Sequence, residues 1–181
     1  HRSASAPSVT GDGISMALKA GAALRTFGRQ KNAAWAPMLR DTRIATTDAN
    51  VPSFLRAVPG TVVVARNGMR VGNEAEYYPD FLIHMFKHAE NEGTSKVEAF
   101  IVGDHRAMRR YGFGTAVIKP FPFPLRAHLR SGLVTTGCTI GDLADRCGIN
   151  REKLEATVKA INGYAASGRD TEFGRGENPF E

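Results

Sequence analysis

The turn Thr10-Gly11-Asp12-Gly13 leads into a run of small and apolar residues and is a first candidate for chemistry. Asp12 can accept a backbone N–H as a helix N-cap, because residues with helical apolar spacing follow it directly. Gly11 and Gly13 allow backbone angles that a residue with a Cβ resists. The turn therefore has two interpretations, a capped helix packed on a core or a close approach of the backbone to a flat ligand.

Tyr78 is a second candidate, as a general base. A phenol has an unperturbed pKa of about 10, so it removes protons near neutral pH only when hydrogen bonds or positive charge stabilise the phenolate. The alternative is a half-buried aromatic side chain before a helix. His84 and His88 have the spacing of a metal pair, but no third ligand stands nearby, so we expect no metal site. Asp104 beside His105 is interpreted as a turn rather than a catalytic pair.

The composition is that of an ordinary globular protein. With 181 residues, of which 42% are hydrophobic and 23% charged, the chain can bury one core, or one core with an appendage. No apolar run approaches the roughly 20 residues of a membrane span. The net charge of +6 comes from scattered basic residues, so nucleic acid is not the expected partner. Cys138 and Cys147 lack metal-ligand spacing, which favours reduced thiols and a cytoplasmic location.

Helical spacing of apolar residues predicts four helices. The first covers residues 12–26 and is expected to bury one face, which contains Ile14, Ala17, Leu18, Gly21 and Ala22. The second begins at Pro79 and continues to about residue 91. A short helix is expected after Thr139, and a longer one over residues 150–166, ended by Gly168.

Two strand patterns lie between these helices. Residues 61–65 and 69–71 flank Asn67-Gly68, a dipeptide that tolerates positive φ, so a hairpin is predicted. Residues 97–102 have the pattern of a buried strand. Residues 28–59 and the proline-rich stretch at 120–124 are expected to be irregular or extended.

Three segments, in order, resemble motifs of one flavoprotein family. Residues 10–22 are similar to TGDG(I/L)-x-MA-x-x-AGA, found in the family of succinate dehydrogenase and fumarate reductase flavoproteins, aspartate oxidase and 3-ketosteroid Δ1-dehydrogenase. Residues 68–74 resemble G-x-R-F-x-N-E, with Val71 in place of Phe. Residues 139–176 resemble T-x-x-x-L-A through G-x-D-x-x-F-G-R-G, in which Arg175 is interpreted as structural. The ordered set covers nearly the whole chain.

This resemblance implies roles for particular residues. Thr10, Gly11, Asp12 and Gly13 would bind FAD. Four residues after Glu74, fumarate reductases have a proton-donating arginine, whereas ketosteroid Δ1-dehydrogenases have a tyrosine that removes a proton beside the ring ketone. This chain has Tyr78 there. The expected substrate-binding residues are Trp35, Glu74 and Tyr77.

The sequence thus predicts an α+β fold that resembles the capping (catalytic) domain of this flavoprotein family. Residues 1–40 are expected to be the trailing edge of an FAD-binding domain, and residues 41–181 a substrate-binding capping domain. The expected activity is FAD-dependent oxidation of a CH–CH bond beside a carbonyl in a ketone or steroid-like substrate. The alternatives are a fumarate reductase-like or succinate dehydrogenase-like flavoprotein and a free-standing binding domain without flavin. The 181-residue chain alone is expected to be inactive, because it needs the rest of the FAD-binding domain and its glycine-rich phosphate loop.

Overall fold

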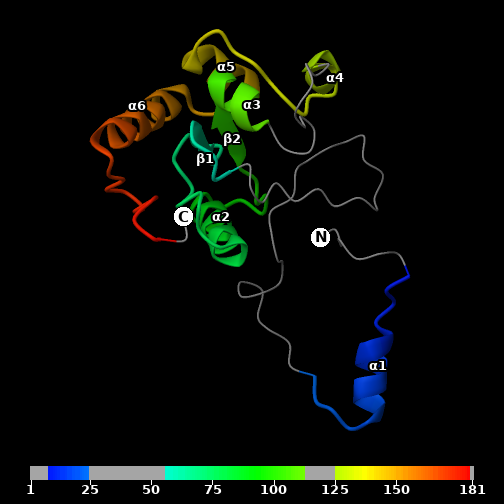
Figure 1. Cartoon of the computed structure of the whole chain (residues 1–181). Helices are drawn as coiled ribbons and strands as arrows, with labels where there is room; N and C mark the ends of the chain where they lie inside the picture. Colours follow the sequence, from blue (N-terminus) through cyan, green and yellow to red (C-terminus); the bar gives the residue numbers. More distant parts are fainter. Residues whose placement is uncertain (1–7, 25–55, 113–124, 180–181) are drawn as a thin grey trace.

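The computed structural model describes residues 8–24, 56–112 and 125–179 (Figure 1). These residues form a mixture of helices and one small sheet. In chain order the elements are α1 (Asp12–Lys19), β1 (Thr61–Val64), α2 (Tyr78–Asn91), β2 (Phe100–Gly103), α3 (His105–Tyr111), α4 (Leu125–Arg130), α5 (Ile140–Cys147) and α6 (Arg151–Ser167). The α+β class is therefore confirmed for the described part of the chain.

Strand β1 is the centre of the described fold. It pairs antiparallel with β2, with Thr61 opposite Gly103 and Val64 opposite Phe100. Val64 also forms an antiparallel bridge with Arg70, so β1 has a neighbour on each edge. All four β1 residues are consequently buried.

The two faces of β1 pack against different helices. Val62 and Val64 join a cluster with Ala144 of α5 and Leu154 of α6, while Val63 joins a second cluster with Phe81 of α2. Because successive strand side chains point to opposite faces, one four-residue strand supplies both clusters. Figure 1 shows α2 on one side of the strands and α5 on the other.

The predicted Asn67-Gly68 turn is confirmed, whereas the second arm of the hairpin is a single bridge rather than a strand. The backbone N–H of Gly68 donates to Ala65 O at 2.9 Å, and Gly68 has a φ of +82°. Helix α6 docks against this turn, since Thr157 Oγ1 donates to Gly68 O at 2.8 Å.

The predictions for α2, α5 and α6 are confirmed. Thr139 caps α5 by accepting the N–H of Asp142, and Asn150 caps α6 by accepting the N–H of Lys153. Gly168 ends α6 in the left-handed region. The expectation for the second strand was partly wrong, because β2 begins only at Phe100 and Val102 alone is buried. Helices α3 and α4 were not predicted.

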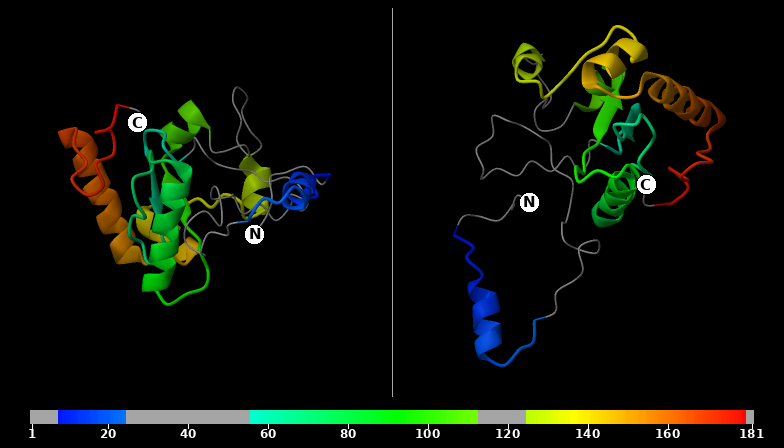
Figure 2. Two further views of the ribbon diagram at one scale, coloured as in Figure 1. Left: turned by 90° about the horizontal axis from the view of Figure 1, so that it is seen from below. Right: turned by 180° about the vertical axis from the view of Figure 1, so that it is seen from behind.

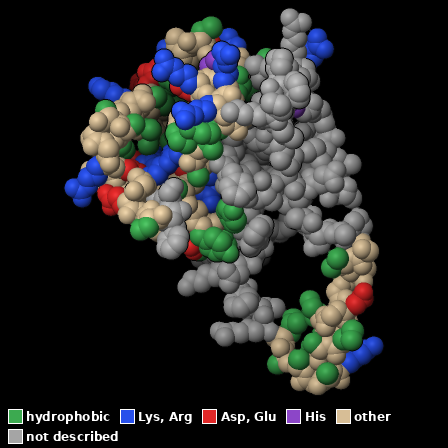
Figure 3. Space-filling model, in the orientation of Figure 1, with side chains coloured by type: hydrophobic (Ala, Val, Ile, Leu, Met, Phe, Trp, Pro, Cys, Tyr) green, Lys and Arg blue, Asp and Glu red, His purple; other side chains and the backbone are tan. Residues whose placement is uncertain are grey.

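The predictions for the first helix were wrong in three respects. Helix α1 ends at Lys19, because Gly21 takes a φ of +89° just beyond it. Gly11 is the N-cap, and Asp12 is already the first helical residue. The face that was expected to be buried is exposed, because no other described residue covers it. Hydrophobic atoms gather on α1 in Figure 3, and the right view of Figure 2 shows α1 apart from the other described elements.

Other expectations lie wholly or partly outside the described residues. Trp35 and the proline-rich stretch at 120–124 are outside, as are residues 28–55. Within the described residues, no helix is both long and apolar enough to cross a membrane.

Substitution of Gly68 tests the docking of α6. A Cβ at this position would lie 2.7 Å from both Asn150 O and Leu154 N, in addition to the strain of positive φ. We expect Gly68→Ala to lower the free energy of unfolding by roughly 2–5 kcal/mol, measured by urea denaturation. Gly93→Ala is the matched control, because Gly93 also has positive φ but nothing within 4 Å, so a loss of only about 1 kcal/mol is expected. Equal losses would contradict the collision.

Candidate functional site

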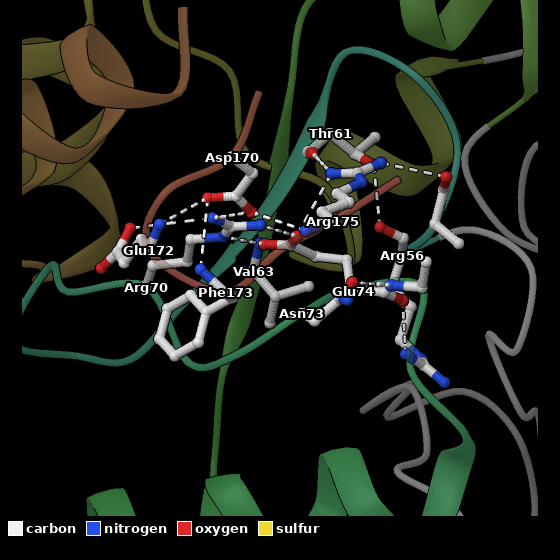
Figure 4. Close-up of polar contacts among 12 residues, drawn as sticks. Arg56, Thr61, Val63, Arg70, Asn73, Glu74, Asp170, Glu172, Phe173 and Arg175 are labelled. Carbon is white, nitrogen blue, oxygen red and sulfur yellow. Dashed lines mark hydrogen bonds and ion pairs between the residues drawn. The ribbon is translucent and has the colours of Figure 1, made fainter. Parts of the chain in front are cut away.

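The carboxylate of Glu74 is the centre of the candidate site (Figure 4). It is 0% exposed and receives hydrogen bonds from two arginines and a strand. Arg70 donates from Nε to Oε1 at 2.9 Å and from Nη2 to Oε2 at 2.7 Å. Arg175 Nη1 donates to Oε2 at 3.2 Å, and the N–H of Val63 donates to Oε1 at 3.2 Å. Glu74, the expected substrate ligand, is thus bound by donors of its own chain.

Arg70 connects Glu74 to the C-terminal segment. Its Nη1 lies 2.7 Å from Asp170 Oδ2 and 3.7 Å from Glu172 Oε2. Asp170 also accepts backbone N–H groups of the turn that follows it, at 3.0 Å from Glu172, 3.3 Å from Phe173 and 3.1 Å from Arg175. The turn is therefore folded around Asp170, which Arg70 ties to the centre of the site.

Arg175 ties the same turn to the segment before β1. Its Nη1 donates to Thr61 O at 2.8 Å, and its Nη2 donates to the carbonyl oxygens of Ala57 and Val58 at 3.0 Å each. These contacts support the structural interpretation of Arg175. The network thus joins residues about a hundred positions apart in the sequence.

The network changes the acidity of its members. Burial lowers the pKa of Arg70, but hydrogen bonds and charges of Glu74 and Asp170 outweigh burial, so the net shift is upward. Burial raises the pKa of Asp170, but the bond from Arg70 and three backbone N–H groups outweigh burial, so the net shift is downward. Burial raises the pKa of Glu172. Arg70 and Asp170 are therefore held firmly in their charged forms.

Tyr78 is the first residue of α2 and is half-buried. The helix begins there because Pro79 suits the first turn and Tyr77 O accepts the N–H of Phe81 at 3.0 Å. Arg56 lies over the Tyr78 ring, 5.4 Å from its centroid, and over the Phe81 ring at 4.7 Å. The ring of Tyr78 thus lies beside Arg56 at the start of α2.

An open hollow of about 670 Å³ lies beside the start of α2. Tyr77 borders it and is 61% exposed, whereas Tyr78 is not among the described residues that line it. His84 Nε2, also in the hollow, lies 3.1 Å from Glu76 Oε2. Among the residues that the structure describes, no three His, Cys, Asp or Glu side chains lie close enough together to hold a metal ion.

The turn at Thr10–Gly13 begins α1 without a side-chain cap. The hydroxyl of Thr10 donates to Asp12 Oδ1 at 2.9 Å. Gly11 has a φ of +86°, and neither Gly11 nor Gly13 has a neighbour within 4 Å of an added Cβ. The first N–H groups of a helix have no partner within it, so this turn offers donors on an open surface.

Sequence reasoning did not identify Arg56, Arg70 or Asp170 as members of a site. Arg70 and Asp170 belong to quoted motifs, and their pairing joins the second and third motifs in space. Arg56 carried no sequence signal. Asp104 is the N-cap of α3, since it accepts the N–H of Ala107 at 2.7 Å. The interpretation of Asp104-His105 as a turn was therefore wrong, because α3 begins at His105.

Removal of the Arg70 side chain tests the energetic importance of the network. Arg70→Met leaves the carboxylates of Glu74 and Asp170 without their main partner, so we expect a loss of about 3–5 kcal/mol in the free energy of unfolding. Arg169→Met is the control, because its 3.4 Å bond to Glu177 is exposed and should contribute less than about 1 kcal/mol. Urea denaturation measures both, and similar losses would contradict the role of Arg70.

The lowered pKa of Asp170 predicts a pH dependence of stability. A carboxylate with a depressed folded-state pKa stabilises the fold above its unfolded pKa, which is about 3.9, and this contribution disappears as pH falls through the folded value. Asp170→Asn should therefore be less stable than the wild type at pH 7, with the difference shrinking below about pH 4. Thermal or urea unfolding at several pH values measures this, and a difference independent of pH would contradict it.

Comparisons with known proteins give the family. The family model described as "FAD binding domain" matches residues 1–180. The 4-oxocyclohex-2-ene-1-carboxylate 5-dehydrogenase of Sinomonas cyclohexanicum is 36% identical over 178 residues, which cover 94% of this chain and 28% of that protein.

Two solved structures are similar to the fold. The 3-ketosteroid Δ1-dehydrogenase of Sterolibacterium denitrificans, in complex with 1,4-androstadiene-3,17-dione, is 29% identical with a TM-score of 0.78 over 99% of this chain and 31% of its own. The open form of a flavocytochrome c3 fumarate reductase is 25% identical with a TM-score of 0.60, over 96% of this chain and 26% of its own. The chain thus spans less than a third of these proteins. It belongs to the FAD binding domain family, alongside ketosteroid dehydrogenase and fumarate reductase flavoproteins.

Proposed function

We propose that this chain is part of an FAD-dependent dehydrogenase that introduces a carbon–carbon double bond beside a ring ketone. The name of the similar 3-ketosteroid Δ1-dehydrogenase describes such a reaction. The observation that carries the proposal is Tyr78, which stands four residues after Glu74 at the start of α2. An arginine at that position would have favoured fumarate reduction. Family membership favours a flavin enzyme over a free-standing binding domain.

We propose that residues 1–40 form the trailing edge of the FAD-binding domain and residues 41–181 most of the capping domain. The exposed apolar face of α1 supports this division, because Ile14 and Leu18 on that face are 56% and 49% exposed and would be buried by packing against further protein. Residues 56–112 and 125–179 instead contain their own buried clusters. The free thiols of Cys138 and Cys147 fit the predicted cytoplasmic location.

The turn at Thr10–Gly13 fits a flavin. Its uncapped first-turn N–H groups are hydrogen-bond donors, and the absence of a Cβ at Gly11 and Gly13 allows a flat ring to approach the backbone. Asp12 is held by Thr10 at the same turn. FAD bound there would accept a hydride from the substrate, which no amino-acid side chain can do.

The residues of this chain would provide the acid–base half of the reaction. Tyr78, as phenolate, would take the proton from the carbon next to the ketone, while the neighbouring carbon loses the hydride and the two carbons form a double bond. Glu74 would act by position, because its carboxylate is bound by Arg70 and Arg175. Four residues later the chain starts α2, so the network fixes where Tyr78 stands.

A ketone on a largely apolar ring is the proposed substrate class. The 3-ketosteroid Δ1-dehydrogenase and the 4-oxocyclohexene-carboxylate dehydrogenase both have names that describe cyclic ketones. Tyr77 is available for contact with a substrate, since it borders the hollow and is 61% exposed. Trp35 stays a prediction outside the described residues.

Replacement of Tyr78 tests the proposal in the full-length flavoprotein. We expect Tyr78→Phe to lower turnover of a 3-ketosteroid, measured with an artificial electron acceptor, by roughly 100- to 10,000-fold, the usual contribution of a general base. The visible flavin spectrum should stay unchanged. Tyr111→Phe is the control, because Tyr111 lies on α3, and it should retain wild-type turnover.

Each other outcome has a distinct meaning. Full turnover in Tyr78→Phe would remove Tyr78 from the mechanism, and a comparable loss only in Tyr77→Phe would transfer the role to its neighbour. A flavin that is indifferent to steroids but is reoxidised by fumarate would favour the fumarate reductase-like alternative. Absence of flavin would contradict an FAD-dependent enzyme.

A further inference from the structure

Arg56 is a buried cation whose guanidinium donates, among the described residues, to main-chain carbonyl oxygens. It is 3% exposed, and its guanidinium donates to the carbonyl oxygen of Glu74 from Nη1 and to that of Glu76 from Nη2, the latter at 2.5 Å. Its Nε is buried with no hydrogen-bond partner in the described structure. Burial of a charge costs free energy unless the surroundings offset it.

The other two arginines of this region are neutralised differently. Arg70 pairs with Glu74 and Asp170, and Arg175 pairs with Glu74. For Arg56, no carboxylate oxygen of a described residue lies within the 4.0 Å of an ion pair. Its guanidinium instead covers aromatic rings, those of Phe81 and Tyr78. Arg56 therefore keeps its guanidinium outside the ion pairs of the network, and the carboxylates of Glu76 and Glu74 attract it without direct contact.

This charge is adjacent to Tyr78. A guanidinium over an aromatic ring holds the neutral ring by a cation–π contact. When the phenol loses its proton, the same guanidinium faces an anion at close range in a partly dry environment, where opposite charges attract more strongly than in water. One contact thus holds the ring and places a positive charge beside it.

We propose that Arg56 is the positioning residue that holds Tyr78 and stabilises its phenolate. This inference rests on the proposed function, since it supplies the positive charge that a tyrosine base needs. Arg56 transfers no proton itself. The proton passes from the substrate carbon to Tyr78 and then to solvent, while the guanidinium stays charged.

Among the described residues, the ionisable groups named next do not provide that charge. Glu76 and Asp80 flank Tyr78 in sequence and oppose a phenolate when they are ionised. His84 is paired with Glu76, and the carboxylate of Glu74 is bound by Arg70 and Arg175. The ring of Tyr77, centred 5.6 Å from that of Tyr78, carries no positive charge.

The pH profile of the full-length flavoenzyme tests this role. Arg56→Gln removes the charge but keeps an amide that can donate to the carbonyl oxygens. The assay measures kcat against pH with a 3-ketosteroid and an artificial electron acceptor. We expect the acidic limb of the Arg56→Gln profile to move to higher pH by about one unit or more. On that limb kcat should fall by about 10-fold, and it should recover at high pH. Arg56→Lys keeps the charge and should shift the limb less.

The control is Arg110→Gln, because Arg110 lies over the Tyr111 ring at a comparable 5.5 Å on the exposed helix α3. Its pH profile should match the wild type. A loss of kcat in Arg56→Gln that is the same at every pH would show a merely structural role and overturn the proposal. So would an unchanged profile.

Two further measurements cover the remaining outcomes. If Arg56→Gln does not bind FAD, the ultraviolet difference spectrum between the wild-type and Tyr78→Phe enzymes decides. A tyrosinate band already present at about pH 8 supports the role of Arg56, and one that appears only near the ordinary tyrosine value of about pH 10 overturns it. Full activity of Tyr78→Phe would instead refute the proposed function, so the two failures are distinguishable.

Discussion

The burial of the Glu74 carboxylate is the constraint on which the rest of this structure depends. An isolated carboxylate in a dry interior is very costly, so it must be given donors and counter-charges by its own chain. Arg70 reaches it from four residues away, and Arg175 reaches it from a hundred and one. Asp170 forms an ion pair with Arg70 and accepts the backbone N–H of Arg175, so it also shapes the turn from which Arg175 emerges. Departure of the C-terminal segment from the sheet would therefore take Arg175 away from Glu74 and Asp170 away from Arg70.

The same network organises the strand and the helix on either side of it. Val63, in the middle of β1, presents one side chain to the α2 cluster and its N–H to Glu74. Arg175 donates hydrogen bonds to the carbonyl oxygens of Ala57 and Val58 before β1. Arg56 donates to those of Glu74 and Glu76. Hydrophobic burial drives the elements together, but it is non-directional. The directional bonds of the arginines set where α2 begins, and with it the place of Tyr78.

Helix α1 shows the opposite situation. Its sequence has clear helical spacing, and the helix forms, yet its apolar face stays exposed among the described residues. Periodicity reports which side chains share a face, whereas burial of that face depends on a partner. Under the proposed assignment of residues 1–40 to a flavin-binding domain, that partner is further protein of the same domain.

Local signals in the sequence by themselves determined much of the secondary structure. Thr139 and Asn150 mark helix starts, Gly168 marks an end, Pro79 suits a first turn, and Asn67-Gly68 forms a reversal, because each acts through backbone geometry or hydrogen bonds within a few residues. The ordered motifs also indicated the family. Tertiary structure alone decided that Glu74 is enclosed rather than open to a ligand, and that Arg56 lies over Tyr78. Glu74 meets Arg56 and Arg175 across 18 and 101 positions of sequence, and the energy of such contacts depends on burial, which no short-range pattern encodes.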